Sequence, residues 1–127
     1  MKKVLIVEDS PPVRHQISEV LTQAGYAVSE AIDGLDGLEQ LRAQAAGAAG
    51  TFELVLCDVN MPRMGGIDLL EEVKRAGITT PFVMLTSEAV PDLMRRARAA
   101  GAAAWVVKPV KPVLLVNAVT KIIGSPS

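Results

Sequence analysis

The regular alternation of short apolar runs with longer segments of helical periodicity constrains the fold of this chain most strongly. The apolar runs lie at residues 4–7, 26–31, 52–57, 81–85 and 104–107. Segments with helical spacing of apolar residues follow at 11–24, 34–46, 66–76, 91–100 and 112–123. Alternating strands and helices predict a parallel sheet with helices on both faces and right-handed crossovers. We therefore expect five βα units in one α/β domain.

Individual residues indicate where some of these predicted elements begin, which side faces the core and which strand lies at an edge. Ser10 followed by Pro11 predicts the N-cap and first position of a helix. Leu35, Leu38 and Leu41 are expected to face inward from the helix at 34–46. The run at 26–31 alternates apolar and polar residues more than the other runs, which favours an edge strand. The helix at 91–100 is rich in Ala and Arg and has only a weak apolar stripe.

Polar residues gather directly after four of the predicted strands. They are Glu8, Asp9, Asp58, Thr86, Ser87 and Lys108, and Pro109 follows the lysine. Open α/β sheets bind their ligands at the carboxyl ends of strands, where the strand order reverses. If the order is 2-1-3-4-5, the first and third strands are neighbours, and Glu8, Asp9 and Asp58 converge.

Three carboxylates in one cleft need compensating positive charge. A like-charged pair about 4 Å apart costs roughly 4 kcal/mol at an effective dielectric constant near 20. Lys108 supplies one positive charge, and a divalent cation would supply the remaining two. Mg²⁺ suits such a site because it takes oxygen ligands and keeps waters that a phosphate can displace.

Asp58 has no better nucleophile arranged beside it. Its carboxylate can attack a phosphoryl group and form an aspartyl phosphate. The metal ion and Lys108 would stabilise charge on the phosphoryl oxygens, and the Thr86 hydroxyl could donate to the product.

At these residues the chain resembles the receiver domain of two-component response regulators. The motifs are the pair Glu8–Asp9, DVNMPRMGG from Asp58, MLTSEA from Met84 and VVKP from Val106. Together they extend the resemblance over essentially the whole chain. It implies a flavodoxin-like (βα)5 fold, α/β and doubly wound, with strand order 2-1-3-4-5. We expect the receiver domain at 1–124 and a short frayed tail at 125–127.

The resemblance also implies roles for the acidic residues. Asp58 would be the phosphoacceptor. Asp9 would be a direct carboxylate ligand of Mg²⁺, and Glu8 would act through a water molecule. Asn60 would give its backbone carbonyl to the metal ion. Asn60 and Glu88 match residue types of the chemotaxis regulators at two positions that tune water attack, which implies fast self-dephosphorylation.

Further roles concern the switch. The resemblance implies that Thr86 is the switch hydroxyl, that Lys108 contacts the phosphate and that the Lys108–Pro109 bond is cis. Trp105 occupies the position of the switch aromatic, where this family more often has Tyr or Phe. Its larger indole opposes a full inward rotation. Our hypothesis is that Trp105 changes its burial on activation.

The implied function is a phosphorylation-operated signalling switch of a two-component phosphorelay. A histidine kinase or histidine phosphotransfer protein would supply the phosphoryl group. The surface formed by the fourth helix, fifth strand and fifth helix would then change for an unknown protein target. The chain would be a monomer or a phosphorylation-dependent dimer. It would not be an enzyme, apart from catalysing its own phosphorylation and dephosphorylation.

Other functions stay open at this point. An aspartate-nucleophile phosphohydrolase usually has Asp-x-Asp, whereas this chain has Asp58-Val59-Asn60 and no cap insertion. A receiver-like binding module that is never phosphorylated would keep the fold without the chemistry. A flavodoxin-like electron carrier is disfavoured because Glu8 and Asp9 would repel a cofactor phosphate.

Charge and composition exclude several classes of partner. The formal net charge of −1 gives no reason to expect nucleic acid or an anionic membrane. No run approaches the roughly 20 apolar residues of a membrane span. The one cysteine, Cys57, excludes an internal disulfide and favours a reducing, cytoplasmic setting. We expect Cys57 to be a packed strand residue.

Overall fold

The computed structural model describes residues 1–45, 51–87 and 90–126 of the chain. Strands and helices alternate as β1 (Lys3–Val7), α1 (Pro11–Gln23), β2 (Ala27–Ala31), α2 (Gly34–Ala45), β3 (Phe52–Asp58), α3 (Gly66–Arg75), β4 (Phe82–Thr86), α4 (Pro91–Ala99), β5 (Ala104–Val107) and α5 (Pro112–Ile123). The five predicted βα units are confirmed, with ends that shift by at most one residue. Residue 46, expected in the second helix, lies outside the described residues.

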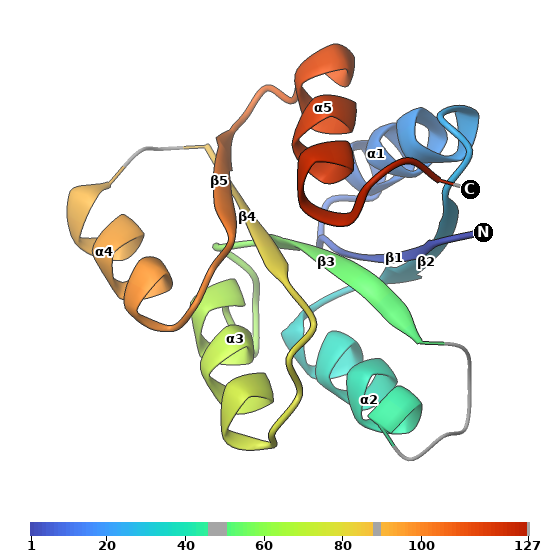
Figure 1. Ribbon diagram of the computed structural model, residues 1–127. Helices are drawn as coiled ribbons and strands as arrows, with labels where there is room; N and C mark the ends of the chain where they lie inside the picture. Colours follow the sequence, from blue (N-terminus) through green and yellow to red (C-terminus); the bar gives the residue numbers. More distant parts are fainter. Residues whose placement is uncertain (46–50, 88–89, 127) are drawn as a thin grey trace.

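The strands form one parallel sheet in the order β2-β1-β3-β4-β5, as predicted. The more strongly alternating strand β2 lies at an edge of this sheet, also as predicted. Helices α1 and α5 cover one face of the sheet, and α2, α3 and α4 cover the other (Figure 1). The strand order therefore places the carboxyl ends of β1 and β3 side by side at the centre of the sheet.

Each face of the sheet has its own apolar core because successive strand residues point to opposite faces. Under α1 and α5, the buried helix residues are Ile17, Leu21, Leu115 and Val119. Under α2, α3 and α4, they are Leu38, Leu41, Ile67, Leu69, Leu70, Val73 and Ala97. Ala97 is the one fully buried residue that α4 contributes from its described length, which confirms the weak stripe expected there.

The buried face of α2 differs from the predicted one. Leu35 is 39% exposed, so the expectation that it faces inward is wrong. The buried positions are instead Gly34, Gly37, Leu38 and Leu41, which follow the i, i+3, i+4, i+7 spacing of one helix face. A Cβ at Gly37 would lie 3.0 Å from a methyl group of Val7. Gly37 lets the helix approach the sheet closely, and Gly34 lets it approach Met64 in the loop after β3. Neither glycine carries an apolar signal in the sequence.

Contacts at the chain ends also depart from expectation. Tyr26, predicted within the second strand, precedes it and is fully buried. Its hydroxyl lies 3.0 Å from Thr120 Oγ1 and donates to the Gly124 carbonyl at 2.8 Å. Pro126, expected in a frayed tail, accepts a hydrogen bond from the Lys2 backbone N–H at 3.2 Å. The Tyr26 bonds tie the end of α5 to the start of β2, and the Lys2 bond ties the tail to the start of β1.

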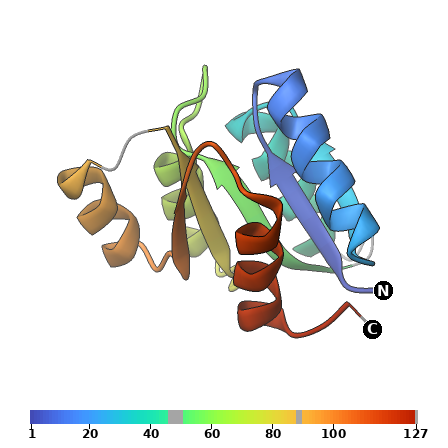
Figure 2. The same ribbon diagram turned by 90° about the horizontal axis from the view of Figure 1, so that it is seen from above.

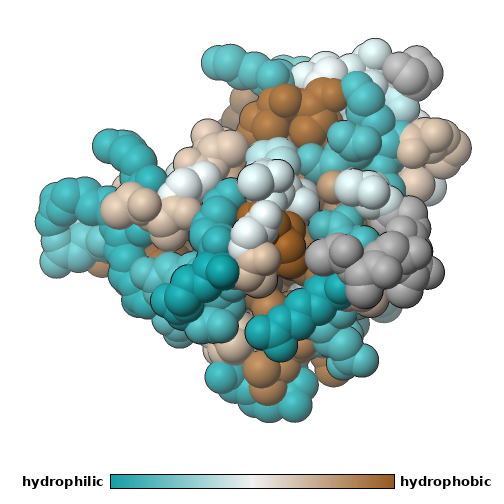
Figure 3. Space-filling model, turned by 60° about the horizontal axis from the view of Figure 1, so that its bottom comes forward, coloured by the Kyte–Doolittle hydropathy of each residue, from teal (hydrophilic) through white to brown (hydrophobic). Residues whose placement is uncertain are grey.

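The outer surface is mixed in polarity. Hydrophilic residues cover most of the face shown in Figure 3, and hydrophobic residues show there as separate patches. None of the helices in the described parts of the chain is long and apolar enough to cross a membrane.

Candidate functional site

The carboxyl ends of β1 and β3 bring three acidic side chains together. Glu8 and Asp9 follow β1 directly, and Asp58 is the last residue of β3. One carboxylate oxygen from each lies within 4.8 Å of the other two, so the predicted convergence is confirmed. Glu8 and Asp58 are buried, whereas Asp9 is exposed. The cluster therefore has a buried floor and an edge that is open to solvent.

Lys108 reaches into this cluster from the end of β5. Its Nζ atom lies 2.5 Å from Glu8 Oε1 and 3.3 Å from Asp58 Oδ2. Burial acts to lower the pKa of Lys108, but the contacts with the two acids outweigh it, so the pKa is raised. The amine therefore stays charged at neutral pH. The Lys108–Pro109 peptide bond is cis, as the resemblance implied.

The buried carboxylate of Glu8 has a partner at each oxygen. Oε1 contacts Lys108, and Oε2 accepts a hydrogen bond from the Ser10 backbone N–H at 3.1 Å. Ser10 occupies the N-cap position of α1, but its side chain makes no capping hydrogen bond. The expected cap residue thus holds Glu8 through its backbone.

Arg14 is a supporting residue that the sequence did not reveal. Its Nη1 donates to the backbone carbonyl of Glu8 at 2.8 Å, and its Nε donates to Glu30 Oε1 at 3.0 Å. Arg14 therefore joins the end of β1 to α1 and to β2. An arginine in the first turn of a helix gives no sequence signal for such a contact.

Asp58 is oriented by the chain that follows it. Its Oδ1 accepts a hydrogen bond from the Asn60 backbone N–H at 3.2 Å, while Oδ2 faces Lys108. A Cβ at Gly66 would lie 2.2 Å from the Asp58 carbonyl oxygen, so only glycine fits where α3 begins. This close approach lets the chain turn directly after Asp58.

Cys57 lies behind the acidic cluster in the core, as expected of a packed strand residue. Burial raises the pKa of its thiol well above the ordinary value, and the charges of Asp58 and Glu8 raise it further. The thiol therefore stays protonated and does not compete with Asp58 as a nucleophile.

Thr86 and Trp105 lie on the same face of the sheet. Thr86 is buried at the end of β4, and its carbonyl accepts a hydrogen bond from the Lys108 backbone N–H at 2.7 Å. Trp105 pairs with Met84, two residues before Thr86, so the two side chains share a face. Glu88, expected to tune water attack, lies outside the described residues.

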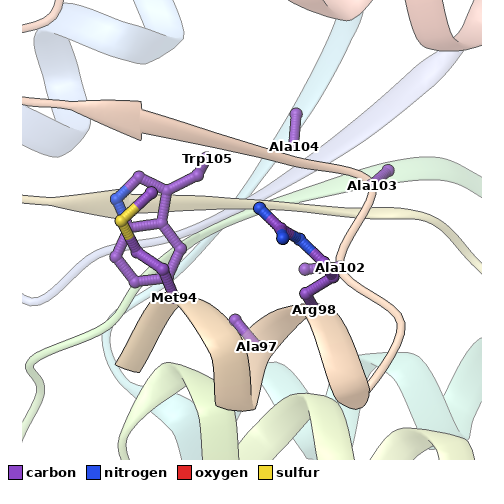
Figure 4. Close-up of a pocket in the computed structure, with 7 residues that line it drawn as sticks. All are labelled: Met94, Ala97, Arg98, Ala102, Ala103, Ala104 and Trp105. Carbon is purple, nitrogen blue, oxygen red and sulfur yellow. The ribbon is translucent and has the colours of Figure 1, made fainter. Parts of the chain in front are cut away.

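The indole of Trp105 borders an open space under α4. A cavity of about 140 Å³ lies between α4 and β5, and the indole stands beside it together with Met94 and Arg98 (Figure 4). The buried indole Nε1 has no hydrogen-bond partner in the described parts of the chain. Such an orphaned donor is costly. The site thus has an aromatic residue with free volume next to it.

Comparison with known proteins identifies the family. A family model for the response regulator receiver domain matches residues 4–120. The chain belongs to this family. Receiver domains are signalling switches and generally not enzymes. They act with histidine kinases or phosphotransfer proteins and generally bind Mg²⁺ at an acidic pocket, which agrees with the cluster around Asp58.

Individual receiver-domain relatives support this assignment. The transcriptional regulatory protein PdtaR of Mycobacterium tuberculosis is 39% identical over 109 residues, which cover 85% of this chain and 50% of PdtaR. The chemotaxis protein CheY of Thermotoga maritima is 30% identical over 122 residues, covering 95% of this chain and 97% of that protein. The chain spans about half the length of PdtaR but nearly the full length of this CheY.

A solved structure of another receiver-domain protein resembles this chain over nearly its whole length. The chemotaxis protein CheY4 of Vibrio cholerae superposes with a TM-score of 0.85 at 36% identity, covering 96% of this chain and 98% of that chain. The two chains therefore share the receiver fold over almost their whole length.

Proposed function

We propose that this chain is a phosphorylation-operated switch whose phosphoacceptor is Asp58. The observation that carries the proposal is the placement of the Asp58 carboxylate. It lies buried at the strand-order reversal, beside two further carboxylates and 3.3 Å from the Lys108 amine. The receiver domain spans residues 1–124 in this proposal, with a tail at 125–127.

The proposed step is a phosphoryl transfer from a phosphohistidine of a histidine kinase or histidine phosphotransfer protein. An Asp58 carboxylate oxygen forms a bond to phosphorus, and the bond between phosphorus and the imidazole nitrogen breaks. The imidazole keeps the electron pair of that bond and takes a proton. The Asn60 N–H holds Asp58 in orientation, and the Lys108 ammonium is placed to meet charge on the phosphoryl oxygens.

The donor set fits Mg²⁺. The charge balance of the cluster supports a divalent cation, because its three carboxylate oxygens lie within 4.8 Å of one another and one lysine contacts only two of the acids. Asp9, Asp58 and the Asn60 carbonyl would hold the ion, with Glu8 acting through water. When bound, Mg²⁺ supplies positive charge against the phosphoryl oxygens.

Phosphorylation adds about −1.5 to −2 charges at neutral pH, and this charge is the proposed trigger. The Thr86 hydroxyl moves toward the phosphoryl group, and Trp105 changes its burial in the space beside α4. The surface of α4, β5 and α5 then changes for a protein target. Val107 and Leu114 are exposed on this surface and leave apolar area available for contact.

The test is phosphotransfer from each phosphorylated histidine kinase of the host organism, with Asp58→Asn beside the unaltered chain. We expect rapid Mg²⁺-dependent transfer from one donor and none to the Asp58→Asn variant. Equal labelling of the variant would contradict the assignment of Asp58. Steady turnover of a small phosphomonoester would instead support the phosphohydrolase.

A further inference from the structure

The loop between β3 and α3, residues 59–65, is anchored at its base and at its tip. At the base, the Gly66 N–H donates to the Val59 carbonyl at 3.0 Å. At the tip, Arg63 forms an ion pair with Asp33, which precedes α2. Figure 2 shows the light green segment between β3 and α3 projecting beyond the ends of the strands. A projecting loop with two anchors has a defined position despite its exposure.

The backbone at the tip is unusual. Arg63 has a φ of 67° and is the one non-glycine residue with positive φ in the described parts of the chain. The Met64 N–H donates to the Pro62 carbonyl at 2.8 Å, which closes a three-residue turn around Arg63. A γ-turn with positive central φ is the rarer, strained form. Such backbone persists where surrounding contacts hold it in place.

Those contacts come from the start of α2. Arg63 Nε donates to Asp33 Oδ2 at 2.8 Å, and Nη2 contacts the same oxygen. Asp33 is only 5% exposed, and its Oδ1 accepts a hydrogen bond from the Asp36 N–H at 2.9 Å. A Cβ at Gly34 would lie 2.4 Å from the Met64 carbonyl oxygen. The first turn of α2 thus forms a close-fitting seat for the loop.

Asn60 lies between the two anchors. Its N–H donates to Asp58 Oδ1, and its carbonyl is the proposed metal ligand. A shift of the loop would change the orientation of Asp58 and the position of that carbonyl together. Arg63 and Asp33 are three or more residues from these groups in sequence, and both lie outside the acidic cluster.

We propose that Arg63 and Asp33 are positioning residues for the phosphorylation site. Their ion pair holds the loop so that the Asn60 carbonyl and the Asp58 carboxylate keep the arrangement that a divalent cation needs. This inference rests on the proposed function, and it assigns a role to two residues that would touch neither the cation nor the phosphoryl group.

Four variants separate the possible causes. Arg63→Ala removes the ion pair. Asp33→Asn removes the charge and keeps a side chain that caps helices well. Arg63→Gly removes the ion pair and relieves the backbone strain at positive φ. Arg75→Ala is the matched control, because Arg75 is similarly exposed and forms an ion pair with Glu72 away from the loop.

Backbone amide NMR supplies two readouts. A Mg²⁺ titration gives the Kd, and hydrogen exchange of the Asn60 and Met64 amides in metal-free protein reports on the loop itself. We expect Arg63→Ala, Arg63→Gly and Asp33→Asn each to raise the Mg²⁺ Kd about tenfold, the low end of outer-shell effects. The two amides should exchange faster in all three. The Arg63→Ala/Asp33→Asn double variant should have the same Mg²⁺ Kd as either single variant, because both substitutions remove the same contact.

Three results would overturn the inference. The first is a Kd within about twofold of the unaltered chain for Arg63→Ala and Asp33→Asn, since mutational effects below that factor are small. The second is an equal loss in Arg75→Ala. The third is normal binding by Arg63→Gly, which would assign the loss in Arg63→Ala to backbone strain. The proposed function is tested separately, by phosphoryl labelling of Asp58 in the unaltered chain. If Asp58 is labelled, the proposed function holds whatever these variants show, and if it is not labelled, that function is refuted.

Discussion

The Nζ atom of Lys108 lies 3.3 Å from Oδ2 of Asp58, although Asp58 ends β3 and Lys108 follows β5. The same amine contacts the fully buried carboxylate of Glu8. One cation is therefore shared by two carboxylates that water reaches poorly. This sharing makes Lys108 important for stability as well as for the proposed phosphoryl transfer.

Replacing Lys108 by Met should destabilise the protein and make its stability depend more on Mg²⁺. The variant leaves two buried acids without their cation, and removing one partner of a buried ion pair costs about 3–5 kcal/mol of unfolding free energy. Mg²⁺ should recover part of this loss by binding the folded state. Urea unfolding with and without Mg²⁺ measures both effects. Lys111→Met is the control, because Lys111 is exposed at the end of the same loop. An equal loss in the control would contradict the account.

Asp33 should add an acid-sensitive contribution to stability. Burial acts to raise the pKa of its carboxyl, but the Asp36 N–H and Arg63 outweigh burial and lower the pKa below the ordinary value of 3.8. A carboxylate whose pKa is lowered in the folded state contributes to the unfolding free energy. This contribution is fully present above the pKa of the unfolded state and is lost as the pH falls through the pKa of the folded state. The unfolding free energy should therefore fall more steeply below about pH 4 in the unaltered chain than in Asp33→Asn. Parallel curves from urea unfolding across this range would refute the prediction.

The thiol of Cys57 should be unreactive while the protein is folded. Burial and the neighbouring acids raise its pKa, and the thiolate is the reactive form. A chromogenic disulfide reagent should react slowly with native protein and at once with protein unfolded in urea. Rapid stoichiometric reaction of the native protein would show that Cys57 is accessible and would contradict the packing described here.

The fold was predictable because its signals are local. Each apolar run marked a strand, and burial on both faces made these runs continuous. The wrong orientation of Leu35 has a clear cause: the buried face of α2 passes through Gly34 and Gly37, which have no apolar side chain. The convergence of Glu8, Asp9 and Asp58 followed from the rule that ligands bind where the strand order reverses, together with the strand order 2-1-3-4-5 that the family resemblance implied.

The supporting contacts were not predictable from sequence. Arg14 and Arg63 meet their partners through tertiary geometry, and both are ordinary polar residues in the sequence. Asp33 could have been recognised as a helix cap before Gly34, but its second contact with Arg63 depends on the path of a distant loop. Residue type identifies the chemical groups here, whereas the contacts that hold them require the structure.

Trp105 should report activation through its fluorescence, because it is the single tryptophan of the chain. Mg²⁺ with beryllofluoride, a phosphoryl analogue, should change the emission as the indole moves relative to the cavity beside α4. Thr86→Ala should reduce this change, since the proposed movement begins at the Thr86 hydroxyl. Unchanged emission in the unaltered chain would argue against a switch role for Trp105.

The central claim is that Asp58 accepts a phosphoryl group with the help of a divalent cation. Intact-mass spectrometry after incubation with acetyl phosphate tests this claim most directly. In the presence of Mg²⁺ we predict a mass increase of one phosphoryl group. We predict no increase when Mg²⁺ is chelated before acetyl phosphate is added, and none in Asp58→Asn. Asp92→Asn, a change at an exposed carboxylate on α4, should be labelled normally. Labelling of Asp58→Asn, or no labelling of the unaltered chain with Mg²⁺, would contradict the account.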